Sequence, residues 1–240
     1  MFTHYRTQGF ILGKTDRGEF DRVVTIYTKD FGKMDFLAKA ERKINSKLRG
    51  GLGLFYLSDI EFIQGKAYKI LTDVILINNF ENLRKDFKIS ALSFKIAKTL
   101  DSLIRGQESD LRIWEFLNEI FEKLSNRPLA ISHWQLLYYY FLWNLFSILG
   151  YRPELYFCSV CRKKLTFGKI YFSFKTGGLV CSSCQGSLAK EVNPNAVKII
   201  RIIIKGDWPT LKKLKFGAED LKSLEIFSKH YLLEVLSETE

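Results

Sequence analysis

Residues 54–76 read LFYLSDIEFIQGKAYKILTDVIL, and this stretch decides the fold of the first third of the chain. In its first half, Ile60 and Phe62 alternate with Asp59 and Glu61, which is the two-residue period of a strand with one buried face. After a turn-like Gln-Gly-Lys sequence the alternation resumes. The pattern predicts a β-hairpin whose buried face carries Leu54, Tyr56, Ile60, Phe62, Tyr68, Ile70, Val74 and Leu76.

Shorter alternating runs precede this hairpin. They are centred on Phe10, on Val24 and Ile26, and on Phe36, and each predicts one short strand. Five antiparallel strands within residues 1–80 favour a small closed barrel, because closure leaves no strand edge unpaired. Both an oligonucleotide-binding (OB) barrel and an SH3-like barrel fit this pattern.

The apolar period becomes that of a helix beyond residue 80. Apolar stripes predict helices near residues 92–103, 111–124, 195–205 and 218–236. Another stretch, Leu129–Tyr151, contains no formally charged residue, and ~20 such residues are enough to span a bilayer. Its polar side chains nevertheless fall on one helical stripe, which favours a buried central helix, with Pro128 near its start, over a membrane span. These side chains are His133, Tyr140, Asn144 and Ser147.

The charge balance indicates a polyanionic partner. The 240 residues include 37 Lys and Arg against 26 Asp and Glu, a net charge of +11, and almost all of the excess lies in residues 1–80 and 151–190. Such a bias speaks for nucleic acid as a ligand, while 47% hydrophobic residues argue against a disordered or collagen-like chain. No secretory signal is visible in residues 1–10, so we expect a cytoplasmic, nucleoid-associated protein.

Four cysteines form the strongest motif. Cys158-x-x-Cys161 and Cys181-x-x-Cys184 are separated by 19 residues, and two such pairs complete the four-thiolate shell that Zn²⁺ prefers. Disulfides are the alternative, which the expected reducing compartment disfavours. Because four thiolates leave no position for water, we predict one structural zinc ion in a hairpin module at residues 154–188. The fold class is therefore α+β, with a barrel domain at residues 1–80 and a helical domain at residues 81–240 that carries this module.

Basic residues follow the second cysteine directly. Arg162, Lys163 and Lys164 either compensate the charge of the zinc–thiolate cluster or contact phosphates. The two interpretations are about equally supported by the sequence, so these residues are possible additional DNA ligands.

A second basic segment joins the third and fourth predicted strands. Lys39, Arg42, Lys43, Lys47 and Arg49 lie within eleven residues and predict a loop that grips the phosphates of a single strand beside the barrel. A solvated charge run is the alternative. Signals for catalysis are weak, since His4, His133 and His230 have no partner at metal-ligand spacing and no complete phosphate loop occurs. We therefore predict a binding protein and not an enzyme.

The order of several short motifs resembles the RecO family of recombination mediators in bacterial DNA repair. The resembling segments are Gly9-Phe10-Ile11-Leu12, Gly18-Glu19-Phe20-Asp21-Arg22-Val23-Val24-Thr25, Phe31-Gly32-Lys33, the basic loop up to Leu48-Arg49-Gly50, and Leu149-Gly150-Tyr151-Arg152-Pro153. The resemblance implies an N-terminal OB barrel and a helical domain with an inserted zinc module. Some members of the family lack the full cysteine set, so the zinc prediction rests on the four cysteines of this chain.

The resemblance also implies a function and partners. It implies binding of single- and double-stranded DNA, annealing of complementary strands, and loading of RecA onto strands covered by single-strand-binding protein. RecR, the acidic C-terminal tail of single-strand-binding protein and, indirectly, the RecA–DNA filament are the implied partners. The alternative from another class is a zinc-ribbon factor of transcription or translation that binds RNA or a large assembly.

Overall fold

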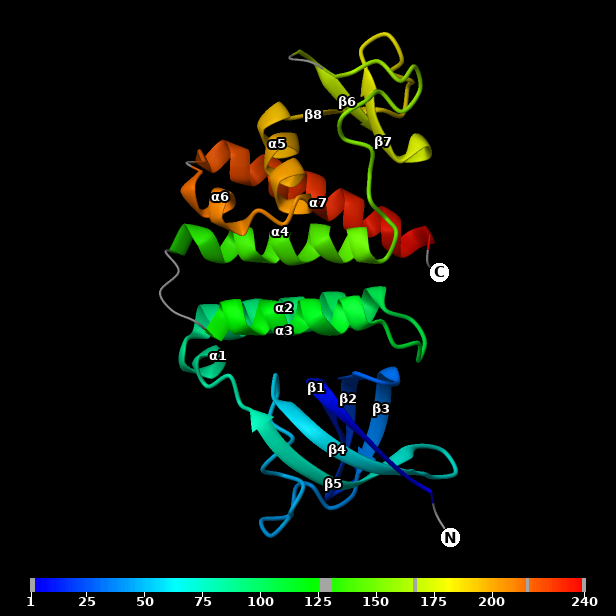
Figure 1. Cartoon of the computed structure of the whole chain (residues 1–240), viewed down its shortest axis with the longest axis vertical. Helices are drawn as coiled ribbons and strands as arrows, with labels where there is room; N and C mark the ends of the chain where they lie inside the picture. Colours follow the sequence, from blue (N-terminus) through cyan, green and yellow to red (C-terminus); the bar gives the residue numbers. More distant parts are fainter. Residues whose placement is uncertain (1–2, 126–130, 166–167, 215, 239–240) are drawn as a thin grey trace. The chain divides into compact units, whose positions relative to one another are not determined.

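Strands dominate the first part of the chain and helices most of the rest (Figure 1). The computed structural model describes residues 3–125, 131–165, 168–214 and 216–238. The chain folds into two compact units, Met1–Ala130 and Ile131–Glu240. The first unit thus contains helices in addition to the barrel, so the domain boundary expected at residue 80 stays a prediction.

The first unit is built around a closed five-stranded barrel. Its strands are β1 (His4–Arg17), β2 (Asp21–Thr28), β3 (Gly32–Ala38), β4 (Leu57–Gln64) and β5 (Lys69–Asn78). The strand order is β1-β2-β3-β5-β4, β4 also pairs with β1, and the β3–β5 pairing alone is parallel. This crossing of the chain from β3 to β4 gives the Greek-key arrangement of OB barrels, so the predicted five-stranded barrel is confirmed.

The interior of the barrel follows the predicted alternation in β4 but not in β5. Ile60 and Phe62 are buried as expected. In β5 the buried residues are Leu71 and Val74, so Val74 is buried as predicted, but Leu71 takes the interior place expected for Ile70. The cause is a register shift at which Glu61 and Phe62 face Asp73 and Leu71, so that β5 has one extra residue and the side chains before it change face relative to those after it. Leu76, which we also placed on the buried face, is 40% exposed.

The first strand is longer than its apolar run predicts. Residues His4–Phe10 pair with β4, and Gly9–Arg17 pair with β2, with a register irregularity between Ile11 and Gly13. Irregularities of this type let a long strand bend and serve both neighbours in a small barrel.

Three helices complete the first unit. They are α1 (Asn82–Lys85), α2 (Phe87–Leu103) and α3 (Leu111–Ser125). The apolar face of α3 packs on the outside of β1, where the Phe10 ring lies 4.8 Å from Trp114 and 5.2 Å from Phe121, centroid to centroid. Phe10 and Phe121 are fully buried. Burial of such rings contributes on the order of 2 kcal/mol each, so this second core supports the barrel wall.

Gly32 gives a test of this packing. It has a φ of +66°, and a Cβ added there would overlap the backbone carbonyl of Glu108, which precedes α3. We expect Gly32→Ala to lower the free energy of unfolding by about 3 kcal/mol, the sum of backbone strain and steric overlap. Gly18→Ala is the matched control, because Gly18 has a φ of +60° with no atom within 4 Å of the added Cβ. It should cost only about 1 kcal/mol in the same urea titration. Equal losses would mean that the contact with Glu108 contributes nothing.

The second unit combines helices with a small sheet. Its elements are α4 (Ile131–Ile148), β6 (Ile170–Ser173), the 3-10 turn η1 (Phe174–Thr176), β7 (Gly178–Cys181), β8 (Lys190–Val192), α5 (Pro194–Ile204), α6 (Trp208–Lys213) and α7 (Ala218–Glu238). In the core Trp143 of α4 is fully buried, its ring lies 4.8 Å from that of Tyr231, and its Nε1 donates to Ser228 Oγ at 3.0 Å. The three-stranded sheet has the order β7-β6-β8.

The uncharged stretch forms the buried helix α4, as predicted. Residues Leu136–Trp143 of this helix are all buried. Across the described ranges, no helix combines the length and the apolar character needed to cross a membrane. Pro128, expected near the start of this helix, lies outside the described residues.

Candidate functional site

The four cysteines converge on one point in the second unit. The Sγ atoms of Cys158, Cys161, Cys181 and Cys184 all lie within 4.8 Å of one another. Those of Cys161 and Cys181 are 3.8 Å apart, far beyond the ~2.05 Å of a disulfide. A tetrahedral zinc ion with Zn–S bonds of ~2.3 Å separates its sulfurs by about 3.8 Å. The predicted cysteine cluster is therefore confirmed, and its spacing fits zinc.

The first cysteine pair lies on a tight turn closed by backbone hydrogen bonds. Cys158 N donates to Lys163 O at 2.8 Å, and Arg162 N donates to Cys158 O at 2.9 Å. Arg162 has a φ of +61°, which reverses the chain directly after Cys161. This geometry points both sulfurs to the same side, as a knuckle around a metal requires.

The second pair follows the hairpin of β6 and β7. Cys181 ends β7, and Cys184 N donates to Cys181 O at 3.0 Å. The hairpin is held to the helices by Phe172, whose ring lies 5.0 Å from Phe227 and 5.7 Å from Tyr231 of α7. The module is thus tied to the helical core through this hairpin and, at Leu155, through a hydrogen bond from Arg201 Nε of α5 at 2.9 Å.

The pKa values of two of these thiols move in opposite directions. Burial raises the pKa of Cys158, but backbone N–H groups of Cys161, Cys181 and Val160 stabilise its thiolate, and the net result lowers the pKa to about 6. Hydrogen bonds to the sulfurs of Cys181 and Cys161 instead raise the pKa of Cys184 to about 12. Zn²⁺ bound to all four sulfurs would favour the thiolate form of each and would leave no open position for chemistry.

The basic loop connects β3 to β4 in the first unit. All five predicted cations, Lys39, Arg42, Lys43, Lys47 and Arg49, have exposed side chains. The loop itself is anchored, because Leu48 and Leu52 are buried in the barrel core and Ser58 Oγ donates to Gly51 O at 2.6 Å. The structure therefore gathers these cations on one short, anchored segment beside the barrel.

The five cations differ in their contacts. Arg42 Nη1 lies 3.4 Å from Asp16 Oδ2, and its backbone N donates to Phe20 O at 3.0 Å. The ammonium group of Lys43 lies 4.9 Å from the centroid of the Phe20 ring. Within the described part of the chain, Lys39, Lys47 and Arg49 have no carboxylate partner. Among the described residues, Arg42 is thus the member of the five that pairs with a carboxylate.

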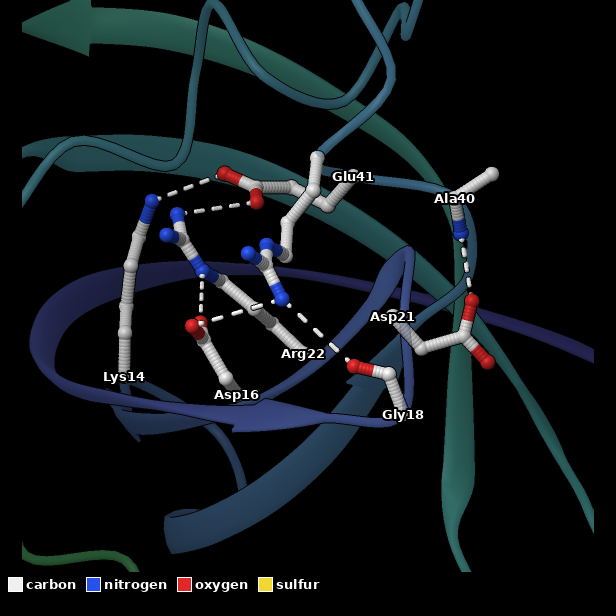
Figure 2. Close-up of polar contacts among 8 residues, drawn as sticks. Lys14, Asp16, Gly18, Asp21, Arg22, Ala40 and Glu41 are labelled. Atoms are coloured by element: carbon white, nitrogen blue, oxygen red, sulfur yellow. Dashed lines mark hydrogen bonds and ion pairs between the residues drawn. The ribbon is translucent and has the colours of Figure 1, made fainter.

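A buried ionic network underlies the loop and was missed by the sequence analysis. The side chain of Glu41 is 1% exposed and accepts hydrogen bonds from Lys14 Nζ at 2.9 Å and Arg22 Nη1 at 3.0 Å (Figure 2). Arg22 Nε also donates to Asp16 Oδ1 at 2.7 Å, which lowers the pKa of Asp16 below its usual value. The sequence held no signal for this network, because Glu41 lies in an ordinary run of charges and the pairing of Asp16 with Arg22 follows from the register of β1 and β2.

The second group of candidate cations lies on the zinc knuckle. Arg162, Lys163 and Lys164 all have exposed side chains. Arg162 and Lys163 also shape the turn through their backbones, as described above. The hydrogen bond from Tyr156 N is the main cause of the lowered pKa of Glu154, and the positive charge of Arg162 lowers this pKa further. Both interpretations of these cations, charge compensation and phosphate contact, therefore stay open.

The histidines that the structure describes are not arranged for catalysis. His4 Nδ1 lies 2.9 Å from Glu61 Oε1 on the exposed wall of the barrel, and His230 lies on the exposed face of α7. The side chain of His133 lies outside the described residues. The arrangements that remain are a metal centre and a basic surface, and both suit binding.

Two family models match almost the whole chain. Recombination protein O N terminal matches residues 1–80, and Recombination protein O C terminal matches residues 84–239. The first covers the barrel, and the second covers the helices and the cysteine module.

Relatives over nearly the full length carry the same name. A protein from Dehalococcoides mccartyi named DNA repair protein RecO is 33% identical over 223 residues, which cover 92% of this chain and 87% of the relative. Proteins of that name from Roseiflexus sp. and Caldanaerobacter subterraneus are 30% and 28% identical over 97% and 87% of this chain, and over 81% and 83% of their own lengths. The barrel, the cysteine module and these matches agree, and the chain belongs to the recombination protein O family.

Proposed function

We propose that this chain is a DNA-binding recombination mediator without catalytic turnover. It binds single- and double-stranded DNA, anneals complementary strands and helps to load RecA onto strands covered by single-strand-binding protein. The observation that carries this proposal is the set of exposed cations on one anchored loop of an OB-type barrel. Membership of a family whose relatives are named for DNA repair supports it.

The proposed mechanism is electrostatic. Cations on the loop take the place of counterions along the phosphate backbone, and the release of those counterions favours binding at low salt. A strand held in this way repels its complement less, so the two strands meet more often and pair. Because the contacts go to phosphates, we expect little dependence on base sequence.

The proposed partners follow from the same surface charge and from the family. RecR, the acidic C-terminal tail of single-strand-binding protein and, indirectly, the RecA–DNA filament are the partners that we propose. A net charge of +11 suits an acidic tail as well as DNA. Because the proposed ligand is chromosomal DNA, we propose that the protein acts in the cytoplasm, associated with the nucleoid. One zinc ion, held by the four cysteines, supports the fold of the module.

Annealing of complementary oligonucleotides tests the proposal. We expect the zinc-loaded full chain to speed pairing of two labelled strands in the absence of ATP, with an effect that fades as salt rises. A non-complementary strand of the same length is the control. Binding of structured RNA in preference to single-stranded DNA, without annealing, would favour the zinc-ribbon factor of transcription or translation instead.

A further inference from the structure

A buried acid lies in the middle of the basic loop. Glu41 is flanked by the proposed DNA ligands, yet its carboxylate is turned inward and is 1% exposed. It bridges two strands of the barrel, since Lys14 belongs to β1 and Arg22 to β2 (Figure 2). A carboxylate out of reach of water needs such partners, because its desolvation is costly unless charge and hydrogen bonds compensate it.

Several further contacts fix the same part of the loop to the β1–β2 hairpin. Ala40 N donates to Asp21 Oδ1 at 2.7 Å (Figure 2). Arg42 Nη1 donates to Gly18 O at 3.4 Å. Ala40 has a φ of +53°, a left-handed conformation that a residue with a side chain adopts only when its surroundings impose it. Residues 40–42 are therefore held in one conformation by contacts before and after Glu41.

We propose that Glu41 is a positioning residue for DNA binding, which holds the root of the basic loop against the β1–β2 hairpin so that Lys39, Lys43, Lys47 and Arg49 meet the phosphates in a fixed arrangement. This inference rests on the proposed function, because it assumes that the loop binds DNA. Glu41 does not touch the ligand. It acts by removing the ordering cost that a mobile loop incurs on binding.

Simple electrostatics gives the opposite expectation. Replacement of Glu41 by glutamine raises the net charge of the protein by one and removes the carboxylate that pairs with Lys14 and Arg22. Both changes should favour the binding of DNA. A positioning role predicts weaker binding in spite of the added charge. The direction of the change in affinity therefore separates the two accounts.

The experiment compares Glu41→Gln with Glu19→Gln, measured by fluorescence anisotropy with a labelled single-stranded oligonucleotide. Glu19 is exposed on the same hairpin, so its substitution adds the same charge without loosening the loop. We expect Glu41→Gln to weaken binding about tenfold and Glu19→Gln to leave it equal or slightly tighter. Hydrogen exchange should show faster exchange in residues 39–51 of the first variant only. Tighter binding by Glu41→Gln would overturn the inference.

A second variant keeps the test valid if Glu41→Gln alone folds poorly. Lys14→Met combined with Glu41→Gln restores the wild-type net charge and removes a cation that would otherwise lose its partner. We expect its melting temperature to recover while its affinity stays below that of the wild type and its salt dependence becomes shallower. Global instability lowers the fraction of active protein but does not change the slope of log affinity against log salt. If affinity recovered together with stability, Glu41 would have only a structural role, and the inference would be wrong.

The outcome also separates this inference from the proposed function. Lys47→Ala combined with Arg49→Ala removes two exposed cations but leaves Glu41 and its partners in place. If this variant binds DNA like the wild type, the loop is not the DNA site and the proposed function fails at this point. If it binds weakly while Glu41→Gln does not, the inference about Glu41 alone is wrong.

Discussion

Replacement of Cys181 by serine is expected to abolish stoichiometric zinc binding and to unfold residues 154–188 while the barrel stays folded. Binding of a structural zinc ion contributes on the order of 10 kcal/mol to the folding free energy of small modules. The short strands β6, β7 and β8 cannot replace the stabilisation that is lost with one of the four ligands. Cys158 is fully buried in the cluster, so the charge of the metal adds to the backbone N–H groups that stabilise its thiolate. Elemental analysis of the purified wild type should give one zinc per chain.

The damage should stay local for a structural reason. Within the module, Phe172 packs on Phe227 and Tyr231 and Phe174 packs on Tyr231, while Trp143 of α4 packs on both Phe227 and Tyr231. The core of the second unit therefore keeps Trp143, Phe227 and Tyr231 together when the module opens. Limited proteolysis should cut within residues 154–188 first and leave the barrel intact.

A neighbouring serine provides the control. Ser182 is exposed within the same knuckle, so Ser182→Ala changes the turn without removing a ligand and should bind zinc like the wild type. If Cys181→Ser retained one zinc per chain and an unchanged melting curve, the four-thiolate site would be wrong. A chelator that strips the wild type should reproduce the proteolysis pattern of Cys181→Ser, which links the damage to the metal and not to the substitution.

The cysteine site and the barrel were predictable from the sequence because both depend on the spacing of residues that are close together in the chain. Two Cys-x-x-Cys pairs specify the ligands without any knowledge of the path between them. The alternation around Ile60 and Phe62 likewise specified a strand and its buried face. Helix α4 was recognised as buried because its polar residues share a stripe, and Asn144 of that stripe donates to Ile203 O at 3.2 Å, inside the second unit.

What the sequence did not predict depends on register between strands. The position of the extra residue in β5 follows from the pairing of this strand with β4, and no residue type in β5 indicates it. Glu41 was missed for the same reason, because its burial follows from the positions of Lys14 on β1 and Arg22 on β2. A charge run in a sequence is usually solvated, and only tertiary structure identifies the one member that turns inward.

Replacement of four loop cations, none of which has a carboxylate partner among the residues that the structure describes, should reduce both DNA affinity and its salt dependence. The variant changes Lys39, Lys43, Lys47 and Arg49 to alanine and keeps Arg42, which Asp16 already engages at 3.4 Å. Each phosphate contact contributes about 0.7 to the slope of log affinity against log salt for a single strand, so the slope should fall by up to about 2.8. The loss should be the same for oligonucleotides of different base sequence, and annealing should fall with binding.

The control must lose the same charge elsewhere. The control variant changes four exposed lysines of the second unit to alanine and so has the same net charge as the loop variant. These lysines are Lys205, Lys213, Lys222 and Lys229. If long-range attraction alone governed binding, the two quadruple variants would behave alike. We expect the loop variant to lose slope and the helical variant to keep it, because counterions are released only where cations contact the phosphates. A loop variant with wild-type affinity and slope would identify the loop as solvated surplus charge, and the phosphate contacts would then be sought at Arg162, Lys163 and Lys164 on the zinc knuckle.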